Sequence, residues 1–197
     1  MPNAYDRVHY PGQPYIQAHP AALGVFAKLF GLPFAPFETC RMLEIGCGDG
    51  VNLINLALSA PNARFVGVDL AEAPIARARA DATACGCDNV EFVALDLRDI
   101  DASFGEFDYI AAHGVLAWVP DTVRVALFPA IGPRLAPHGL AMASFNALPG
   151  ARAWQAMRDM LRYETAKAEA PEDKLRLAVE FLQRSVALWP ENEADGR

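Results

Sequence analysis

The sequence predicts an α/β fold built on a doubly wound parallel sheet. Between residues 41 and 146, short apolar segments that end in glycine or aspartate alternate with longer segments of helical periodicity. Strands joined by intervening helices run parallel, because each helix returns the chain to the same edge of the sheet. The 197 residues, of which 53% are hydrophobic and 21% charged, are enough for one packed domain. We therefore expect a ligand at the carboxyl ends of the strands.

The expected elements follow from the spacing of apolar residues. Strands are predicted at 42–45, 63–68, 90–95, 107–112 and 140–145. Helices are predicted between or beyond them at 51–59, 71–85, 122–135, 151–166 and 172–189. No clear final antiparallel hairpin follows the fifth strand, and the tail 191–197 is expected to fray.

The N-terminal region, residues 1–40, is rich in proline and aromatic residues and contains one expected helix, 21–30. We predict that it forms an arm or lid. Residues 41–150 are then the ligand-binding domain, and residues 151–197 are a helical C-terminal extension. The expected helix 172–189 has a wide apolar arc, which predicts packing on the core, on a second copy in a homodimer, or on a C-terminal domain missing from this chain.

Charge and cysteine content exclude several classes of protein. The formal net charge of −7 and the pI near 5.0 argue against a large nucleic-acid surface. No apolar stretch is long enough for a membrane span, and no secretory leader is visible, so we expect a cytoplasmic protein. The spacing of the cysteines is no zinc framework, so no metal site and reduced thiols are expected; they are Cys40, Cys47, Cys85 and Cys87.

The most informative segment is Leu43-Glu44-Ile45-Gly46-Cys47-Gly48-Asp49-Gly50, between a predicted strand and a predicted helix. Glycines at alternate positions let the backbone turn sharply and approach a ligand closely. The dinucleotide-binding pattern requires a third glycine where Val51 stands, which argues against a nicotinamide-dependent oxidoreductase. Glu44 is expected to be buried in its strand, which is costly for an unpaired carboxylate and suggests a polar site nearby.

Two aspartates follow successive strands. Asp69 ends the second strand and Asp96 ends the third. A carboxylate at Asp69 can accept hydrogen bonds from both hydroxyls of a ribose. Each aspartate also has a plain structural alternative as a helix N-cap.

Together, these residues resemble motif I and the strand-end acids of the class I S-adenosylmethionine-dependent methyltransferases. The resemblance covers roughly residues 41–146 and implies a Rossmann-like fold and S-adenosylmethionine as the cofactor. It implies that Asp96 takes the adenine amino group and that Leu70 and Leu97 flank the adenine. The implied cofactor residues are Glu44, Gly46, Cys47, Gly48, Gly50, Asn52, Asp69, Leu70, Asp96, Leu97, His113 and Gln17.

A narrower likeness lies in three segments, 10–20, 111–120 and 144–150. They are similar to those of bacterial methyltransferases that carry a C-terminal regulatory domain, some of which methylate protein lysines. The likeness implies that the first segment leans over the cofactor and that the other two line the methyl-transfer pocket. The pocket or cofactor contacts that it implies are Tyr15, Gln17 and His19, and the residues near the transferred methyl are His113 and Asn146. We take His113, Asn146 and Tyr15 as the candidate catalytic residues.

The predicted function is methyl transfer to a nucleophilic acceptor, either a protein lysine or a small molecule. The alternative from another class is a non-catalytic cofactor-binding or interaction module. Since the chain stops at Arg197, where the regulatory domain of that family would begin, it is either a fragment or a short member.

The sequence also suggests roles, mostly structural, for several other side chains. His113 is either a general base or a structural histidine. Trp118 is expected in the core rather than on the substrate. Ordinary loop positions are expected for His9 and His138, and a solvated helix face for Arg77 and Arg79.

Overall fold

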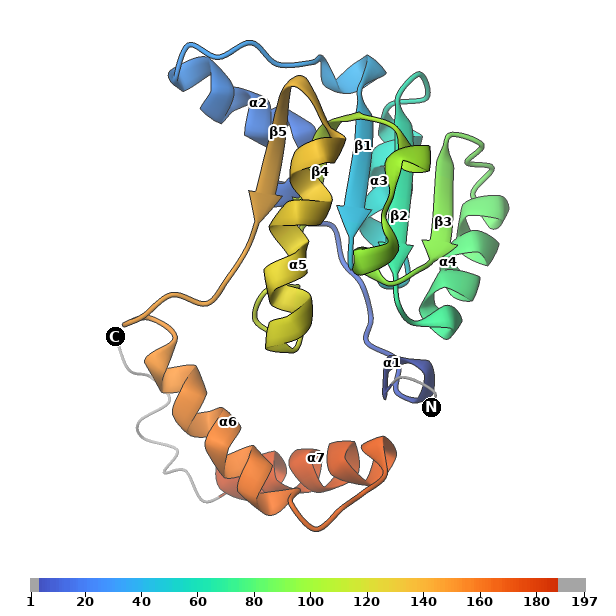
Figure 1. The fold of residues 1–197 in the computed structure, drawn as a ribbon. Helices are drawn as coiled ribbons and strands as arrows, with labels where there is room; N and C mark the ends of the chain where they lie inside the picture. The colour runs from blue at the N-terminus through green and yellow to red at the C-terminus, as the bar shows by residue number, and fades with distance from the viewer. Residues whose placement is uncertain (1–3, 188–197) are drawn as a thin grey trace. The chain divides into compact units, whose positions relative to one another are not determined.

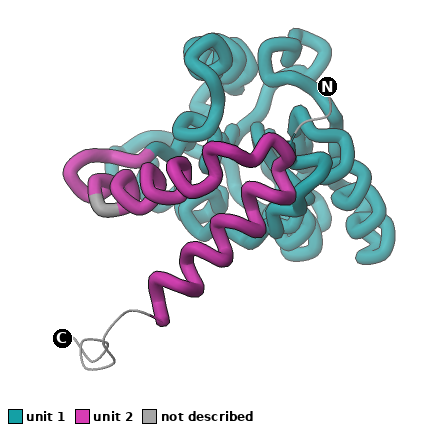
Figure 2. The backbone as a smooth tube through the Cα atoms, turned by 90° about the horizontal axis from the view of Figure 1, so that it is seen from below, with its two compact units in different colours: residues 1–145 teal, residues 146–197 magenta. Residues whose placement is uncertain are grey.

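The computed structural model describes residues 4–187 and divides the chain into two compact units, Met1–Phe145 and Asn146–Arg197 (Figure 2). The first unit contains a parallel sheet of five strands in the order β3-β2-β1-β4-β5 (Figure 1). The strands are β1 (Arg41–Ile45), β2 (Arg64–Asp69), β3 (Val90–Ala94), β4 (Phe107–Ala112) and β5 (Leu135–Ala143). The predicted α/β fold with a parallel sheet is confirmed.

The strand order places a binding crevice at β1. The chain moves outward from β1 to β2 and β3, and then returns to add β4 and β5 on the other side of β1. At such a switch point the loops that follow the two neighbouring strands diverge, which leaves a crevice at their carboxyl ends. The glycine-rich segment follows β1, so it lies at this point.

Helices cover both faces of the sheet, as β1 requires, because its residues 42–45 are all buried although their side chains point alternately to the two faces. Met42 belongs to one buried cluster with residues of α3 (Val51–Ser59) and α4 (Glu72–Ala84). Leu43 and Ile45 belong to the other, with residues of α5 (Asp121–Ile131). Figure 1 shows α3 and α4 on one side of the sheet and α5 on the other.

The N-terminal region contains α1 (Ala4–Arg7), a short 3-10 turn (Ile16–Ala18) and α2 (Pro20–Leu29). The Asp6 carboxylate accepts a hydrogen bond from the backbone N–H of Ala73 at 2.9 Å, which attaches the start of the chain to α4. The segment between α1 and α2 then passes the loop that follows β1, as the contacts below show.

The predicted boundaries around β5 are wrong. The helix expected to reach Leu135 ends at Ile131, and Leu135 is the first residue of β5, where it pairs with Phe107. Phe107 pairs with Leu135 and Tyr109 with Leu140, so residues 136–139, with Pro137 and Gly139, fall outside the pairing with β4 at the edge of the sheet. A proline is tolerated there because its missing N–H is not needed for the pairing. His138, expected in a loop, therefore lies within β5, with a φ of 67°.

The second unit contains α6 (Arg152–Glu164) and α7 (Pro171–Ala187), which contact each other. An ion pair of 3.6 Å joins Arg184 of α7 to Glu164 of α6. Part of the predicted apolar arc of α7 is exposed, namely Leu175, Val179, Leu182 and Val186. Leu188, Trp189 and the tail 191–197 lie outside the described residues. Within residues 4–187, no helix combines the length and apolar character that crossing a bilayer requires.

Candidate active site

The loop after β1 is fixed to the neighbouring strand by its own backbone. The N–H groups of Gly46 and Cys47 both donate to the carbonyl oxygen of Val68 in β2, at 2.7 and 3.1 Å. Gly50 then caps the start of α3. The loop therefore places the first, unpaired N–H groups of α3 at the switch point of the sheet.

Two glycines of this loop have different surroundings. Gly48 and Gly50 both have positive φ, 55° and 74°, which strains any residue with a Cβ. At Gly50 a Cβ would lie 2.5 Å from the ring of Phe92, so this glycine is also needed for packing. At Gly48 a Cβ would meet no atom within 4 Å. The backbone at Gly48 is therefore open to a ligand.

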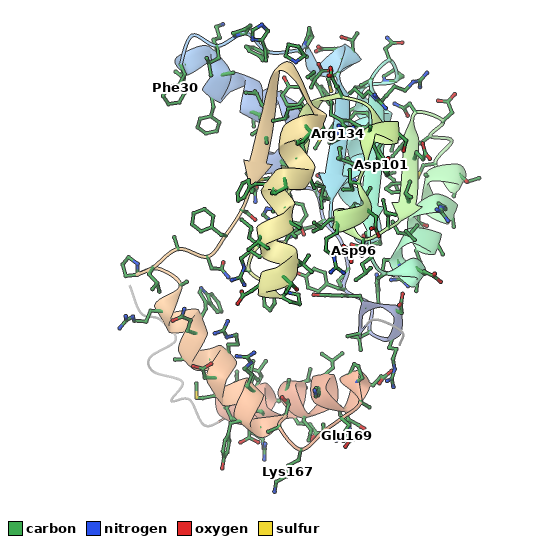
Figure 3. All side chains as sticks on the ribbon, in the orientation of Figure 1. Phe30, Asp96, Asp101, Arg134, Lys167 and Glu169 are labelled. Atoms are coloured by element: carbon green, nitrogen blue, oxygen red, sulfur yellow. The ribbon has the colours of Figure 1, made fainter. Side chains whose placement is uncertain are left out.

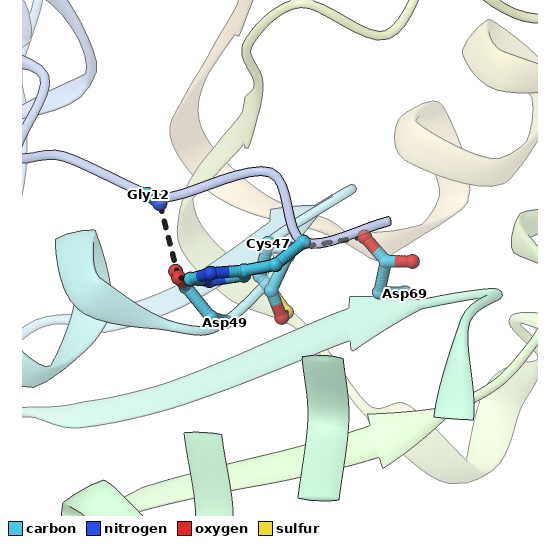
Figure 4. Close-up of polar contacts among 6 residues, drawn as sticks. Gly12, Cys47, Asp49 and Asp69 are labelled. Atoms are coloured by element: carbon cyan, nitrogen blue, oxygen red, sulfur yellow. Dashed lines mark hydrogen bonds and ion pairs between the residues drawn. The ribbon is translucent and has the colours of Figure 1, made fainter. Parts of the chain in front are cut away.

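Asp69 connects this loop to the start of α4. Its Oδ2 accepts the N–H of Gly48 at 2.9 Å (Figure 4). Its Oδ1 accepts the N–H of Ala71 at 2.9 Å. Each carboxylate oxygen has a second lone pair, so the group can accept further hydrogen bonds. Asp69 is not the N-cap of α4, because that position is Ala71 and no side chain caps the helix. Its hydrogen bonds hold the turn before α4 without excluding a ligand.

Asp96 lies at the same edge of the sheet as Asp69. Asp69 is opposite Ala94 in the pairing of β2 with β3, and Asp96 follows two residues later (Figure 3). The Arg98 side chain donates to both oxygens of Asp96, at 2.9 and 2.6 Å, and these hydrogen bonds lower the pKa of the Asp96 carboxyl. Asp96 also caps the short 3-10 turn that follows it by accepting the Arg98 N–H.

Glu44 and Asn52 form a buried polar pair behind the loop. Glu44 is 2% exposed, as its position in β1 predicted, and Asn52 is 5% exposed. The Asn52 Nδ2 donates to both carboxylate oxygens of Glu44, at 3.1 and 3.2 Å. Burial raises the pKa of Glu44 to about 7, and the Asn52 hydrogen bonds offset only part of this effect.

This raised pKa predicts how Glu44 changes stability with pH. As pH rises from 4.5 to about 7, the folded protein holds a proton at Glu44 that the unfolded chain has lost, so the free energy of unfolding falls. The fall is about 3 kcal/mol. Because Glu44→Gln does not titrate, its stability relative to wild type is expected to increase by about that amount over this range. Urea unfolding at both ends of the range measures it, and a constant difference would contradict the assignment.

The arm crosses the same region, held by Asp49. Its Oδ2 accepts the N–H of Gly12 at 3.0 Å and contacts His9 Nε2 at 3.2 Å (Figure 4). A Cβ at Gly12 would overlap Asp49 Oδ1, so only glycine allows this approach. His9 lies in an exposed loop as predicted, but its contact with Asp49 and the role of Asp49 were missed. Its only signal in the sequence is that it lies within the glycine loop.

His113 follows β4 and lies against the arm. Its ring centroid is 4.0 Å from that of Tyr15, with the planes tilted by 39°. Among the described residues its buried Nδ1 has no hydrogen-bond partner. Burial lowers the pKa of His113, which favours the neutral imidazole that can accept a proton. Nearby, the Gly114 N–H donates to Ser144 Oγ at 2.7 Å, which joins the ends of β4 and β5.

The other candidate residues have mixed surroundings. Leu70 is 58% exposed, whereas the side chain of Leu97 is 8% exposed in the cluster beneath α5. Gln17 is exposed and Cys47 is buried. Asn146 is the first residue of the second unit, and its role stays a prediction.

His19 has a structural role that the sequence did not indicate. Its Nδ1 accepts the Ala21 N–H at 3.1 Å, which caps α2, and its ring lies 4.5 Å from that of Phe37. Its predicted contact with the pocket stays a prediction.

Two structural predictions are wrong. Trp118, expected in the core, is 67% exposed. Arg77, expected on a solvated face, has buried Nε and Nη2 atoms with no hydrogen-bond partner in the described structure. Arg79 is exposed, as expected, but donates to the carbonyl oxygen of Phe92 at 2.9 Å.

Residues 4–187 contain no group of three or more side chains suited to hold a metal ion.

Comparison with known proteins supports this arrangement. Residues 42–139 match the model of a methyltransferase domain. The chain is 41% identical over 187 residues to RP789 and 36% identical over 186 residues to RP028, both from Rickettsia prowazekii. These matches cover 93% of this chain in each case, 34% of RP789 and 74% of RP028.

A solved structure of PKMT2 from Rickettsia typhi in complex with AdoHcy has a TM-score of 0.79 and 34% identity. The match to PKMT2 covers 93% of this chain. The chain spans about a third of the length of PKMT2 and of RP789. The match to the methyltransferase domain runs from β1 into β5, on a parallel sheet whose first strand is followed by a glycine loop. The chain therefore belongs to the class I S-adenosylmethionine-dependent methyltransferases.

Proposed function

We propose that the protein binds S-adenosylmethionine at the carboxyl ends of β1, β2 and β3 and transfers its methyl group to an acceptor. The open backbone at Gly48, bonded directly to the Asp69 carboxylate, is the observation that carries this proposal. The start of α3 suits the carboxylate of the cofactor, because a helix N-terminus offers free N–H groups and a partial positive charge.

The remaining cofactor contacts follow the strand order. Asp69 would accept the ribose hydroxyls with its free lone pairs. Asp96 would accept the adenine amino group, with the backbone N–H of Leu97 beside it. Leu70, which is exposed next to Asp69, would cover the adenine ring, whereas the buried Leu97 side chain supports the turn from below.

S-adenosylmethionine supplies a methyl group already activated by its sulfonium, so the chain's task is to orient the acceptor and exclude water. An amine has to be neutral to attack, and His113 would accept its proton. Burial keeps the ring in the neutral form, although the lowered pKa also makes it a weaker base. The Tyr15 ring, 4.0 Å from that of His113, would close this side of the site to water.

A protein lysine is the acceptor that we propose. The three segments similar to bacterial methyltransferases with a regulatory domain, some of which methylate protein lysines, support it, as does the 34% identity to PKMT2 over 93% of the chain. The net charge of −7 suits a cationic acceptor through long-range attraction. A small-molecule acceptor is the alternative.

Thermal unfolding with ligands tests the cofactor. S-adenosylmethionine and AdoHcy are expected to raise the melting temperature by several degrees at roughly a hundredfold their dissociation constants, whereas NAD⁺ should not. No shift with AdoHcy, or an equal shift with NAD⁺, would overturn the proposal.

Labelled methyl transfer tests the acceptor. With a bacterial lysate as acceptor, we expect the label in protein and, after hydrolysis, in methylated lysine. Label confined to small molecules would replace the lysine acceptor with the alternative.

A further inference from the structure

The buried Glu44 and Asn52 side chains join the loop region to the arm. While the Asn52 Nδ2 donates to Glu44, the Asn52 Oδ1 accepts the backbone N–H of Tyr15 at 3.0 Å. Both polar atoms of the amide are therefore engaged within the protein, on partners 8 and 37 residues away in the sequence.

These partners allow only one orientation of the amide. Above its pKa of about 7, Glu44 is ionised and its carboxylate only accepts hydrogen bonds, whereas a backbone N–H only donates them. Turning the amide over would place Oδ1 against the Glu44 carboxylate and Nδ2 against the Tyr15 N–H. Glu44 thus determines which atom Asn52 presents to the arm.

We propose that Glu44 and Asn52 are positioning residues: Glu44 orients the Asn52 amide, which fixes the Tyr15 backbone and thereby holds the Tyr15 ring against His113. This inference rests on the proposed function, since it assigns the pair an effect on the methyl-transfer site through the arm. Neither side chain needs to touch the cofactor for this effect. The expectation that both contact the cofactor stays a prediction beside this indirect role.

A separate anchor on the same arm makes the inference testable. Asp49 holds the N–H of Gly12, and Asn52 holds that of Tyr15. Removal of one anchor should free its own amide first. The two amides therefore report on the two anchors independently.

The first test is amide hydrogen exchange, residue by residue, in the protein without cofactor. In Asn52→Ala we expect the Tyr15 amide to exchange at least about tenfold faster, while Gly12 changes much less. Asn89→Ala is the matched control, because Asn89 is equally buried but donates to the carbonyl oxygens of Ala57, Ala60 and Ala63. It should lower stability and leave Tyr15 protected. Equal exchange at Tyr15 in both variants would reduce the role of Asn52 to general stability and overturn the inference.

The second test exchanges the two functional groups. Asn52→Asp places two carboxylates face to face at about pH 8.5, where both are ionised or compete for one proton. The double variant Glu44→Gln/Asn52→Asp restores a donor opposite an acceptor, with a carboxylate oxygen still available to Tyr15. We expect Tyr15 protection to be lost in the single variant and regained in the double one. A double variant no better than Asn52→Asp would overturn the orienting role of Glu44.

AdoHcy titration then separates this inference from the proposed function. Asn52→Ala is expected to weaken AdoHcy binding roughly tenfold, with recovery in the double variant and no change in Asn89→Ala. If wild type does not bind AdoHcy, the proposed function fails, whereas the exchange results still decide whether the pair holds the arm. If wild type binds AdoHcy and Asn52→Ala binds it equally well, Glu44 and Asn52 hold the arm, but their proposed effect on the methyl-transfer site is wrong.

Discussion

Replacing Gly48 by valine is expected to weaken AdoHcy binding by at least about a hundredfold in a protein that still folds. Two effects act together. The positive φ of 55° strains a β-branched residue by about 1–2 kcal/mol. The valine side chain would also project into the open space beside the loop, where the proposed cofactor has to approach the backbone. Calorimetric titration with AdoHcy measures the loss.

Gly86→Val is the matched control for this variant. Gly86 follows α4, has a φ of 70°, and would also place a Cβ where no atom lies within 4 Å. The two substitutions therefore introduce similar backbone strain at open positions, one inside the loop and one away from it. We expect similar losses of stability in urea, but a loss of AdoHcy binding only at Gly48. Equal affinities in the two variants would show that the loop is a structural turn.

The fold was predictable because its signals are local. Each of the first strands ends at a glycine or aspartate, and the helix 51–59 matches α3 (Val51–Ser59). The error at β5 has a physical reason: Pro137 and Gly139 have turn propensity, and they fit in β5 because residues 136–139 fall outside the pairing with β4 at the edge of the sheet. Local pattern cannot show which strand lies at an edge.

The candidate site was predictable to the extent that it follows strand ends. Asp69 and Asp96 were expected at the same edge of the sheet, and the β2–β3 register places them there. The arm contacts were not predictable in the same way. Gly12 and Asp49 are 37 residues apart, and no periodicity relates them. Such pairing depends on how the arm packs after the sheet has formed.

The arm also explains why single residues were misjudged. Nothing in the sequence around His9 indicates a contact, yet its Nε2 lies 3.2 Å from Asp49 Oδ2 because the arm passes over the loop. Asn52 was named among the cofactor residues that the resemblance implies, but its partner in the arm, the Tyr15 backbone, carries no sequence signal at all. Backbone donors can be assigned only from the structure, since every residue except proline has one.

Asp69→Ala is expected to have the other large effect, again at least about a hundredfold on the dissociation constant of AdoHcy. The substitution removes a carboxylate whose hydrogen bonds to two ribose hydroxyls would contribute about 1.5–3 kcal/mol each. It also releases the Gly48 N–H, which donates to the carboxylate at 2.9 Å. The loop therefore loses a stabilising hydrogen bond, and the site loses an acceptor. Titration calorimetry with AdoHcy measures both effects together.

Two further variants separate these contributions. Asp101→Ala removes an aspartate that accepts the N–H and Oγ–H of Ser103 at a turn elsewhere in the first unit. Like Asp69→Ala, it loses hydrogen bonds that hold a turn, but it should bind AdoHcy like wild type. Asp69→Asn keeps one oxygen acceptor but places an NH₂ group against either Gly48 or Ala71, both of which donate. We therefore expect Asp69→Asn to bind nearly as poorly as Asp69→Ala. If Asp69→Asn instead binds like wild type, the carboxylate charge and its second acceptor are not needed, and Asp69 only holds the turn before α4.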